Sequence, residues 1–339
     1  MTGKRAQLAA YSAGHFWVDF SCALLMFSCH LEKREWALCV LLYNFCAFAL
    51  QMPIGLLADR LSRNSLVAAG GCVLVIFGWM TAPVTLLSAV LAGVGNACFH
   101  IGGGIDVLNE SEKRSAALGI FVSPGAFGIY FGTLIGKPGD VHGIIPVVGL
   151  VLFALLFPGL DRVLRGSLDS GNVPVVLELS GRITWALVCC FFVVVLRSWM
   201  GLAMQFPWKT GGWSLAVICA VVLGKTAGGF FGDRMGMVRS ASLSLGVCAG
   251  LFLLCHIPAA GVAAVFLFNM TMPVTLWAAA RLLPGAKGFA FGTLTFALFL
   301  GFLPVYFGWE IPVGGGTYAL GALVSLGLLR QGLKWGEIP

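Results

Sequence analysis

The sequence predicts an all-α integral membrane protein of twelve transmembrane helices, arranged as two parallel six-helix repeats with both termini in the cytoplasm. Composition is the first observation behind this prediction. Of the 339 residues, 59% are hydrophobic and only 10% are charged, whereas soluble domains carry about 25% charged residues. A water-soluble fold of this composition would expose large apolar patches. A cytosolic enzyme, a disordered chain and a nucleic-acid-binding protein are therefore excluded.

Long apolar runs separated by short polar segments are the second observation. They are too long for strands and do not alternate with a period of two, and the shortest are near the minimum of about 17 residues for crossing a bilayer as a helix. The expected spans are 8–29, 36–58, 66–82, 84–108, 116–136, 144–160, 182–206, 212–232, 241–257, 261–282, 287–308 and 312–331.

The distribution of basic residues gives the orientation, because Lys and Arg concentrate in the cytoplasmic loops of membrane proteins. With the N-terminus inside, most of the 21 basic residues fall on the cytoplasmic side. Those outside are Lys33, Arg34, Lys137 and Lys209. Arg197 and Lys225 fall within spans. This bias places both termini in the cytoplasm.

The longest polar segment divides the chain into two halves. We expect a bundle at 1–160, a cytoplasmic linker at 161–181 and a second bundle at 182–339. A Gly-xxx-Asp-Arg motif follows the second span, ending in Asp59-Arg60, and recurs after the eighth span, ending in Asp233-Arg234, 174 residues later. Since six spans is an even number, the halves have the same orientation and form a parallel repeat.

This repeated motif predicts a cytoplasmic gate. Its glycine lets two helices approach closely, and its aspartate can cap the next helix or pair with a basic residue across the cytoplasmic face. A plain basic turn is the alternative. Asp106 joins the gate because Arg60 or Arg63 can reach it. The predicted gate residues are Gly55, Asp59, Arg60, Arg63, Asp106, Gly229, Asp233 and Arg234.

Ionisable residues inside spans predict a substrate and proton cavity, since each costs about 2.5–3.5 kcal/mol at a helix centre. At about 1.5 Å per residue, Asp19 lies about 16 Å and Arg197 about 22 Å from the cytoplasmic end. His15 and Asp19 share a helix face and can load and unload a proton; a structural pair is the alternative. Arg197 requires an anion, which is either Asp19 or an anionic substrate.

Further polar positions complete the predicted cavity. Asn96 and His100 are four residues apart in a glycine-rich span, where close helix contact is the alternative explanation. Lys225 corresponds to Gln51 across the repeat, and it either faces the cavity or extends its amine to the inner face. The cavity candidates are His15, Asp19, Asn44, Gln51, Asn96, His100, Arg197, Lys225 and Asn269.

The loop motif carries a family resemblance. Gly55-Leu-Leu-Ala-Asp59-Arg60-Leu-Ser62-Arg63-Asn64 resembles the signature of the major facilitator superfamily between helices two and three. Ser62 stands where that family usually has glycine. The second copy keeps Gly236 at the equivalent position but has Met237 in place of a basic residue.

Segments of the first half resemble the fosmidomycin-resistance branch of that superfamily. They are Gly14-His15-Phe-Trp-Val-Asp19-Phe, Gly95-Asn-Ala-Cys-Phe99-His100 and Phe121-Val-Ser-Pro-Gly125-Ala-Phe127-Gly128. The basic residue of the drug–proton antiporter signature in helix four is missing around 86–93. Its absence argues against proton-driven multidrug export by that route.

The resemblance implies a secondary active transporter that moves a small solute by alternating access, and the branch implies efflux. The membrane Asp, His and Arg residues favour proton coupling, and the buried cations favour an anionic or zwitterionic organic solute. Uptake or facilitated diffusion without proton coupling is the alternative; a channel or an intramembrane enzyme is a more distant one.

We expect no catalytic activity, no cofactor, no metal site and no nucleic-acid partner, because no nucleotide-binding, zinc-protease or nucleophile motif occurs. The expected partners are a small-molecule substrate, protons and the lipid bilayer. The expected form is a monomer in the plasma (inner) membrane of a bacterium.

Overall fold

The structure is a computed structural model that describes residues 2–111, 114–139, 141, 143–165, 180–309, 311 and 313–338. Regular secondary structure in these residues is helical. The helices are α1 (Thr2–Leu25), η1 (Met26–His30), α2 (Trp36–Asn44), η2 (Phe45–Ala49), α3 (Gln51–Leu61), α4 (Asn64–Met80), α5 (Thr85–Glu110), α6 (Ala116–Val122), α7 (Pro124–Gly136), α8 (Ile144–Arg165), α9 (Gly181–Ala203), α10 (Gly212–Met235), α11 (Met237–Leu253), α12 (Pro258–Asn269), α13 (Thr271–Leu282), α14 (Lys287–Tyr306) and α15 (Gly315–Trp335).

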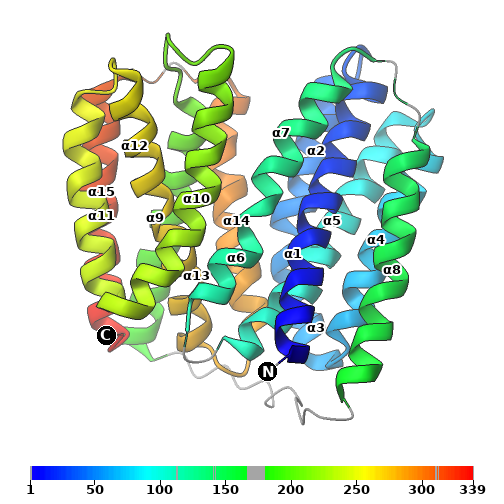
Figure 1. Cartoon of the computed structure of the whole chain (residues 1–339), viewed down its shortest axis with the longest axis horizontal. Helices are drawn as coiled ribbons and strands as arrows, with labels where there is room; N and C mark the ends of the chain where they lie inside the picture. The colour runs from blue at the N-terminus through cyan, green and yellow to red at the C-terminus, as the bar shows by residue number, and fades with distance from the viewer. Residues whose placement is uncertain are drawn as a thin grey trace. The chain divides into compact units, whose positions relative to one another are not determined.

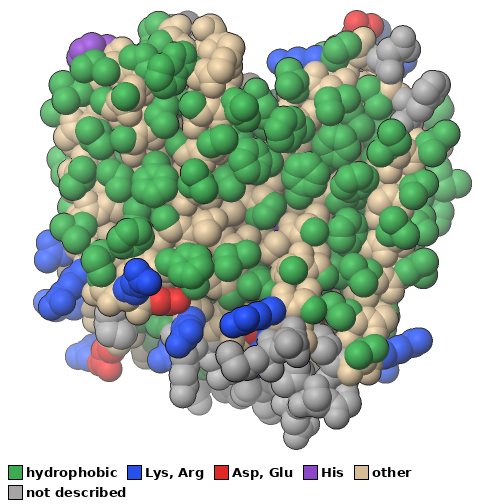
Figure 2. Space-filling model, in the orientation of Figure 1, with side chains coloured by type: hydrophobic (Ala, Val, Ile, Leu, Met, Phe, Trp, Pro, Cys, Tyr) green, Lys and Arg blue, Asp and Glu red, His purple; other side chains and the backbone are tan. Residues whose placement is uncertain are grey.

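Many of the helices have the length and composition of membrane spans. Among the described residues, eight helical stretches of at least 18 residues are apolar enough to cross a bilayer. The other four predicted spans fall on α1, on α15 and on the 17-residue apolar helices α4 and α11. Figure 2 shows hydrophobic side chains covering the middle of the helices, with Lys and Arg near their ends. The protein is therefore an integral, multi-pass membrane protein.

Two compact units make up the chain. The first contains Met1–Glu110, Pro124–Val176 and Gly285–Thr293, and the second contains Ser111–Ser123, Leu177–Pro284 and Leu294–Pro339. Each unit thus includes one short segment from the other half of the sequence. In that way the start of α14 belongs to the first unit, and α6 belongs to the second. Of the predicted linker, 161–165 continue α8, and 166–179 lie outside the described residues.

Within each unit, the first long helix starts at the same end at which the last long helix stops. In the first unit, the start of α1 and the end of α8 lie at the same end (Figure 1). In the second unit, the rings of Trp185 on α9 and Trp335 on α15 are 6.4 Å apart.

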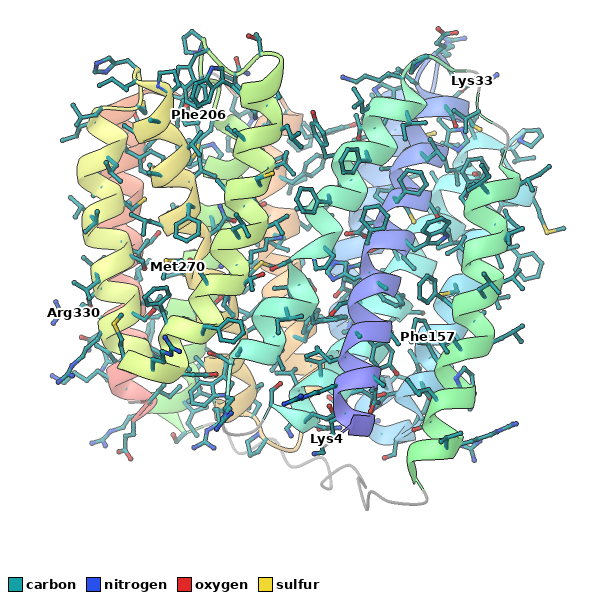
Figure 3. All side chains as sticks on the ribbon, in the orientation of Figure 1. Lys4, Lys33, Phe157, Phe206, Met270 and Arg330 are labelled. Carbon is teal, nitrogen blue, oxygen red and sulfur yellow. The ribbon has the colours of Figure 1, made fainter. Side chains whose placement is uncertain are left out.

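Aromatic packing fixes helix α1 in the first unit. Tyr11 stacks on Phe157 of α8 with ring centroids 4.9 Å apart, and Phe157 lies among the side chains between these helices (Figure 3). Helix α1 also runs along α7 (Figure 1). These contacts hold the face of α1 that carries His15 and Asp19 inside the unit.

Candidate functional site: a buried His–Asp–His cluster and an arginine

Four of the predicted cavity residues meet in the first unit. Helix α1 contributes His15 and Asp19, and α5 contributes Asn96 and His100; all four are buried. The Nε2 atom of His15 lies 3.3 Å from Asp19 Oδ2, and the Nε2 atom of His100 lies 3.8 Å from Asp19 Oδ1. Asn96 donates from Nδ2 to Asp19 Oδ1 over 2.8 Å. The single carboxylate is therefore surrounded by polar partners from two helices.

The hydrogen bonds define where the hydrogens lie. His100 Nδ1 is 2.8 Å from the backbone oxygen of Asn96, and since a carbonyl oxygen only accepts, Nδ1 carries a hydrogen. A neutral His100 therefore presents the lone pair of Nε2 to the cluster. His15 Nε2 lies 2.9 Å from that atom and 3.3 Å from Asp19 Oδ2, so an Nε2 hydrogen of His15 faces two acceptors. The two Nε2 atoms are close enough to have one hydrogen between them. If both Nε2 atoms carried a hydrogen, the two hydrogens would repel and the rings would have to separate.

Gly125, which sequence reasoning did not assign to the cavity, closes the cluster. It lies in the first turn of α7, and a methyl group at this position would overlap with Asp19 Oδ2 and His15 Nε2. Only glycine permits the α7 backbone to approach so closely. The signal was present in the Ser-Pro-Gly sequence at 123–125, where proline ends α6 and starts α7.

The second unit contains a contrasting buried charge. Arg197 on α9 is 7% exposed, and its guanidinium donates to Thr275 Oγ1 on α13 over 3.4 Å. Among the described residues, no carboxylate lies within 4.0 Å of it. The described partners of Asp19 belong to the first unit, so the structure does not show the predicted alternative of an Asp19–Arg197 pair.

The other candidates bond to main-chain oxygens. Asn44, Gln51 and Asn269 each donate an amide hydrogen to the carbonyl four residues earlier in the chain. Lys225 on α10 donates from Nζ to the carbonyl of Val122, the last residue of α6, over 3.2 Å. A cation at a helix C-terminus is favourable. Within the described hydrogen bonds, these four residues do not join the cluster around Asp19.

The two predicted gate aspartates make the same kind of interaction. Asp59 accepts hydrogen bonds from the backbone N–H groups of Gly288 and Phe289, at 2.8 and 2.9 Å. Both lie at the start of α14. Its carboxylate thereby caps a helix N-terminus, where negative charge is stabilising.

In the second unit, Asp233 accepts from the N–H groups of Ser115 and Ala116, at 2.6 and 3.1 Å. These residues precede and begin α6, and they lie 173 residues before Gly288 and Phe289. Each aspartate caps a helix distant in the sequence rather than the next helix along the chain. The repeat therefore includes the capped helix start as well as the motif that caps it.

The motif glycines make these caps accessible. A methyl group on Gly55 would overlap with the backbone of Gly288, and one on Gly229 would approach the Ser115 oxygen to 2.6 Å. Both copies therefore use glycine for close helix contact. The basic residues Arg60, Arg63 and Arg234 are exposed, and no carboxylate of the described residues lies within 4.0 Å of them.

Asp106 has a different environment from the other gate residues. Its carboxylate accepts hydrogen bonds from Tyr11 at 2.6 Å and Gln7 at 3.3 Å, both on α1, and from Asn64 on α4 at 2.7 Å. These bonds join α1, α4 and α5 inside the first unit. The predicted contact of Asp106 with Arg60 or Arg63 is not among them.

The motif ends at a residue with positive φ in both copies. Ser62 follows α3 with φ of 52°, and Gly236 follows α10 with φ of 86°. Glycine adopts such angles without steric cost, whereas a residue with a Cβ atom is strained. This explains why glycine suits the position, and it identifies Ser62 as a strained exception.

Comparison with known proteins places this geometry in a known fold. No protein-family model and no curated protein sequence matches the chain. Among solved structures, that of a point variant of the E. coli fucose:proton symporter FucP is similar, with 15% identity, a TM-score of 0.66, and coverage of 96% of this chain and 97% of that chain.

Two other solved structures are similar over nearly the whole chain. A bacterial homologue of the iron transporter ferroportin, in an outward-facing state, has 15% identity, a TM-score of 0.64 and coverage of 98% and 99%. The human organic anion transporter TETRAN has 14% identity, a TM-score of 0.65 and coverage of 98% and 97%. FucP is described as a member of the major facilitator superfamily. The chain therefore has the fold of major facilitator superfamily transporters.

Proposed function

We propose that the protein is a secondary transporter that moves a small anionic or zwitterionic organic solute by alternating access, coupled to protons. The observation that carries this proposal is Arg197. A guanidinium has five N–H donors and keeps its charge in proteins, yet its one described partner is the hydroxyl of Thr275. A buried charge without a counter-ion is costly, so the site favours an anionic ligand such as a carboxylate or phosphate.

The cluster around Asp19 supports the proton coupling. A carboxylate within 3.8 Å of two imidazoles can hold a proton in more than one place. Because the imidazoles share one hydrogen, gain of another separates them, and the adjacent α7 backbone at Gly125 leaves little space for this. Protonation is thereby linked to helix movement.

The gate supports alternating access. Each capping aspartate holds the start of a helix whose sequence belongs to the other half of the chain. Release of these caps would free both helix starts together. This corresponds to the two-state latch that alternating access requires.

Further features belong to the same proposal. The resemblance of the first half to the fosmidomycin-resistance branch supports efflux, and we place the protein as a monomer in a bacterial inner membrane with twelve spans and both termini in the cytoplasm. The missing basic residue in helix four argues against the drug–proton antiporter route. Among the neighbours, one is named as a proton symporter and another as an organic anion transporter, which supports the coupling and the substrate class.

A counterflow assay tests this proposal. The purified protein is screened against a library of organic acids and amino acids for thermal stabilisation, and the best ligands are tested in proteoliposomes. A carrier shows trans-stimulated uptake of labelled solute and loses it in Arg197→Ala. Arg182→Gln is the matched control, because this arginine is on the same helix but exposed. Flux without trans-stimulation contradicts the proposal in favour of a channel.

A further inference from the structure

The geometry points to a site for a divalent first-row transition-metal ion at His15, Asp19 and His100, where the sequence predicts no metal site. This inference rests on the proposed function, since it gives the proposed proton site a second occupant. Each residue offers one ligand atom, and these atoms all lie within 4.8 Å of one another. All three residues are buried in the first unit.

The distances between the donor atoms fit a single ion. Zinc binds imidazole nitrogen and carboxylate oxygen at about 2.0–2.2 Å, so its donors must lie about 3.0–3.5 Å apart. The two Nε2 atoms are 2.9 Å apart, and His15 Nε2 is 3.3 Å from Asp19 Oδ2. The third separation, from His100 Nε2 to Asp19 Oδ1, is 3.8 Å. This third separation is to the other carboxylate oxygen, so the ion is held either by both oxygens of Asp19 or by Oδ2 alone, with the three donor atoms within 4.8 Å of one another.

The surrounding hydrogen bonds orient the ligands as in established metal sites. A metal-bound histidine usually donates its other N–H to a carbonyl or carboxylate. His100 does so from Nδ1 to the Asn96 oxygen, at 2.8 Å, and its Nε2 lone pair therefore faces the cluster. Asn96 also donates to Asp19 Oδ1 at 2.8 Å, which holds the carboxylate beside the two imidazoles. One residue, Asn96, thus positions two of the three ligands.

The donor set defines the class of ion. Two imidazoles and one carboxylate suit zinc, iron(II), cobalt(II) and manganese(II), whereas magnesium and calcium prefer oxygen ligands alone. The bound ion replaces the one hydrogen that His15 and His100 share. An ion held there bridges α1 and α5 and occupies the proposed proton site, so it acts as an inhibitor of proton-coupled transport.

Binding is measured on chelator-treated, purified protein with zinc and cobalt chloride. By titration calorimetry we expect one zinc ion per chain, at least tenfold weaker binding in His15→Gln and His100→Gln, and parental binding in His30→Gln. His30 is the matched control: it is a buried histidine on the same continuous helix, bonded to Ser88 instead. Each variant is used only if it elutes as a monodisperse peak.

Cobalt absorption on the unmodified protein needs no variant to fold. Weak visible bands without an intense near-ultraviolet sulfur-to-cobalt band support nitrogen and oxygen ligands. A strong sulfur band, or no spectral change, overturns the inference, because the neighbouring Cys22 thiol or no residue at all would then hold the ion. Zinc affinity that is equal in both cluster variants and the parent also overturns it.

The transport assay separates this inference from the proposed function. Transport is measured in vesicles freed of metal, before and after zinc is added. If the protein transports solute with protons, binds no zinc and is not inhibited by it, the metal site is contradicted and the proposed function stands. Zinc binding at the cluster without any solute flux contradicts the proposed function and leaves the metal site standing.

Discussion

The two units treat a buried charge in opposite ways. In the first, the Asp19 carboxylate lies within 3.8 Å of two histidines and accepts a hydrogen bond from Asn96. In the second, the Arg197 guanidinium has one described bond, of 3.4 Å, to a hydroxyl. The Asp19 carboxylate is surrounded by polar groups of the protein, whereas the Arg197 guanidinium retains N–H donors without a described acceptor.

This difference matches the two roles proposed above for the buried charges. A buried charge that the protein itself satisfies is a place to store or exchange a small ion, since its partners can accept or release a hydrogen. A buried charge that lacks a counter-ion gains most from a ligand that supplies one. In the proposed transport cycle, ion coupling therefore belongs to the first unit and solute binding to the second.

Asp19→Asn tests the first half of this comparison and has the largest expected effect. The amide keeps the shape but cannot take up a proton, so proton-driven accumulation should be abolished while solute exchange without a gradient continues. Uptake into proteoliposomes, with and without a pH gradient, measures both. A mutant that still concentrates solute at the parental rate would show that Asp19 is not the coupling site.

Arg197→Ala tests the second half. Loss of the guanidinium should weaken binding of an anionic solute by about 30-fold or more, because truncating one partner of a buried charged pair costs about 2–5 kcal/mol. Arg197→Lys should retain weak binding, since it keeps the charge but not the two-pronged geometry. Binding is measured by calorimetry on folded protein.

A double variant would break the comparison. If each single variant, Asp19→Asn or Arg197→Gln, fails to fold but the protein with both substitutions folds, Asp19 and Arg197 form a structural ion pair. Parental affinity in a folded Arg197→Ala protein would also refute its role in solute binding.

Gly125→Ala sharpens the comparison by crowding only the Asp19 cluster. The added methyl group must displace Asp19, His15 or the α7 backbone, and such overpacking costs about 1–3 kcal/mol. We expect a lower melting temperature and impaired proton coupling, with solute affinity within about twofold of the parent. Gly201→Ala is the control, because a methyl group there meets no other atom within 4 Å. Equal effects of both substitutions would contradict the close-approach argument.

The two gate aspartates allow a test in which each variant controls the other. Loss of a helix cap costs about 0.5–2 kcal/mol, which corresponds to about 2- to 30-fold faster amide exchange. Asp59→Ala should therefore speed hydrogen–deuterium exchange at Gly288 and Phe289, and Asp233→Ala should do so at Ser115 and Ala116. We also expect both variants to shift the transporter away from its outward-open state. Unchanged exchange at the capped amides would rule out the caps.

The smallest expected effect comes from Ser62→Gly. Relief of the left-handed strain should stabilise the protein by about 1 kcal/mol, whereas Gly236→Ser at the equivalent position should destabilise it by a similar amount or more. Thermal unfolding midpoints in detergent measure both. Shifts of the same sign would contradict the strain at Ser62.

Sequence reasoning reached part of the candidate site. The spacing of His15 and Asp19 predicts a shared helix face, because α-helical geometry is local. Their meeting with His100, 85 residues from His15, follows only from the packing of α1 against α5. For the same reason no metal motif is visible in the sequence: the three candidate ligands come from two separate helices. The sequence shows that residue 125 is glycine, but it does not show that the α7 backbone packs against His15 and Asp19 at this position.

The gate shows the same limit. The sequence predicts the repeat and its glycines, since the Gly-xxx-Asp-Arg pattern recurs 174 residues later. It does not predict the partners of the aspartates, because a carboxylate can cap any helix start that tertiary packing brings near. Asp106 was expected beside arginine and instead accepts from Tyr11, Gln7 and Asn64.

By itself, the sequence determined that the chain is a helical membrane protein with a repeated motif. Apolar side chains are costly to expose to water, so this chain enters the bilayer. Inside the bilayer, peptide groups have no water to bond with, and a helix satisfies them within one segment. Tertiary structure decided which polar side chains meet, and it separated a satisfied aspartate in one unit from an arginine with unused donors in the other. Contacts between distant helices depend on how whole surfaces pack, and no local spacing encodes that.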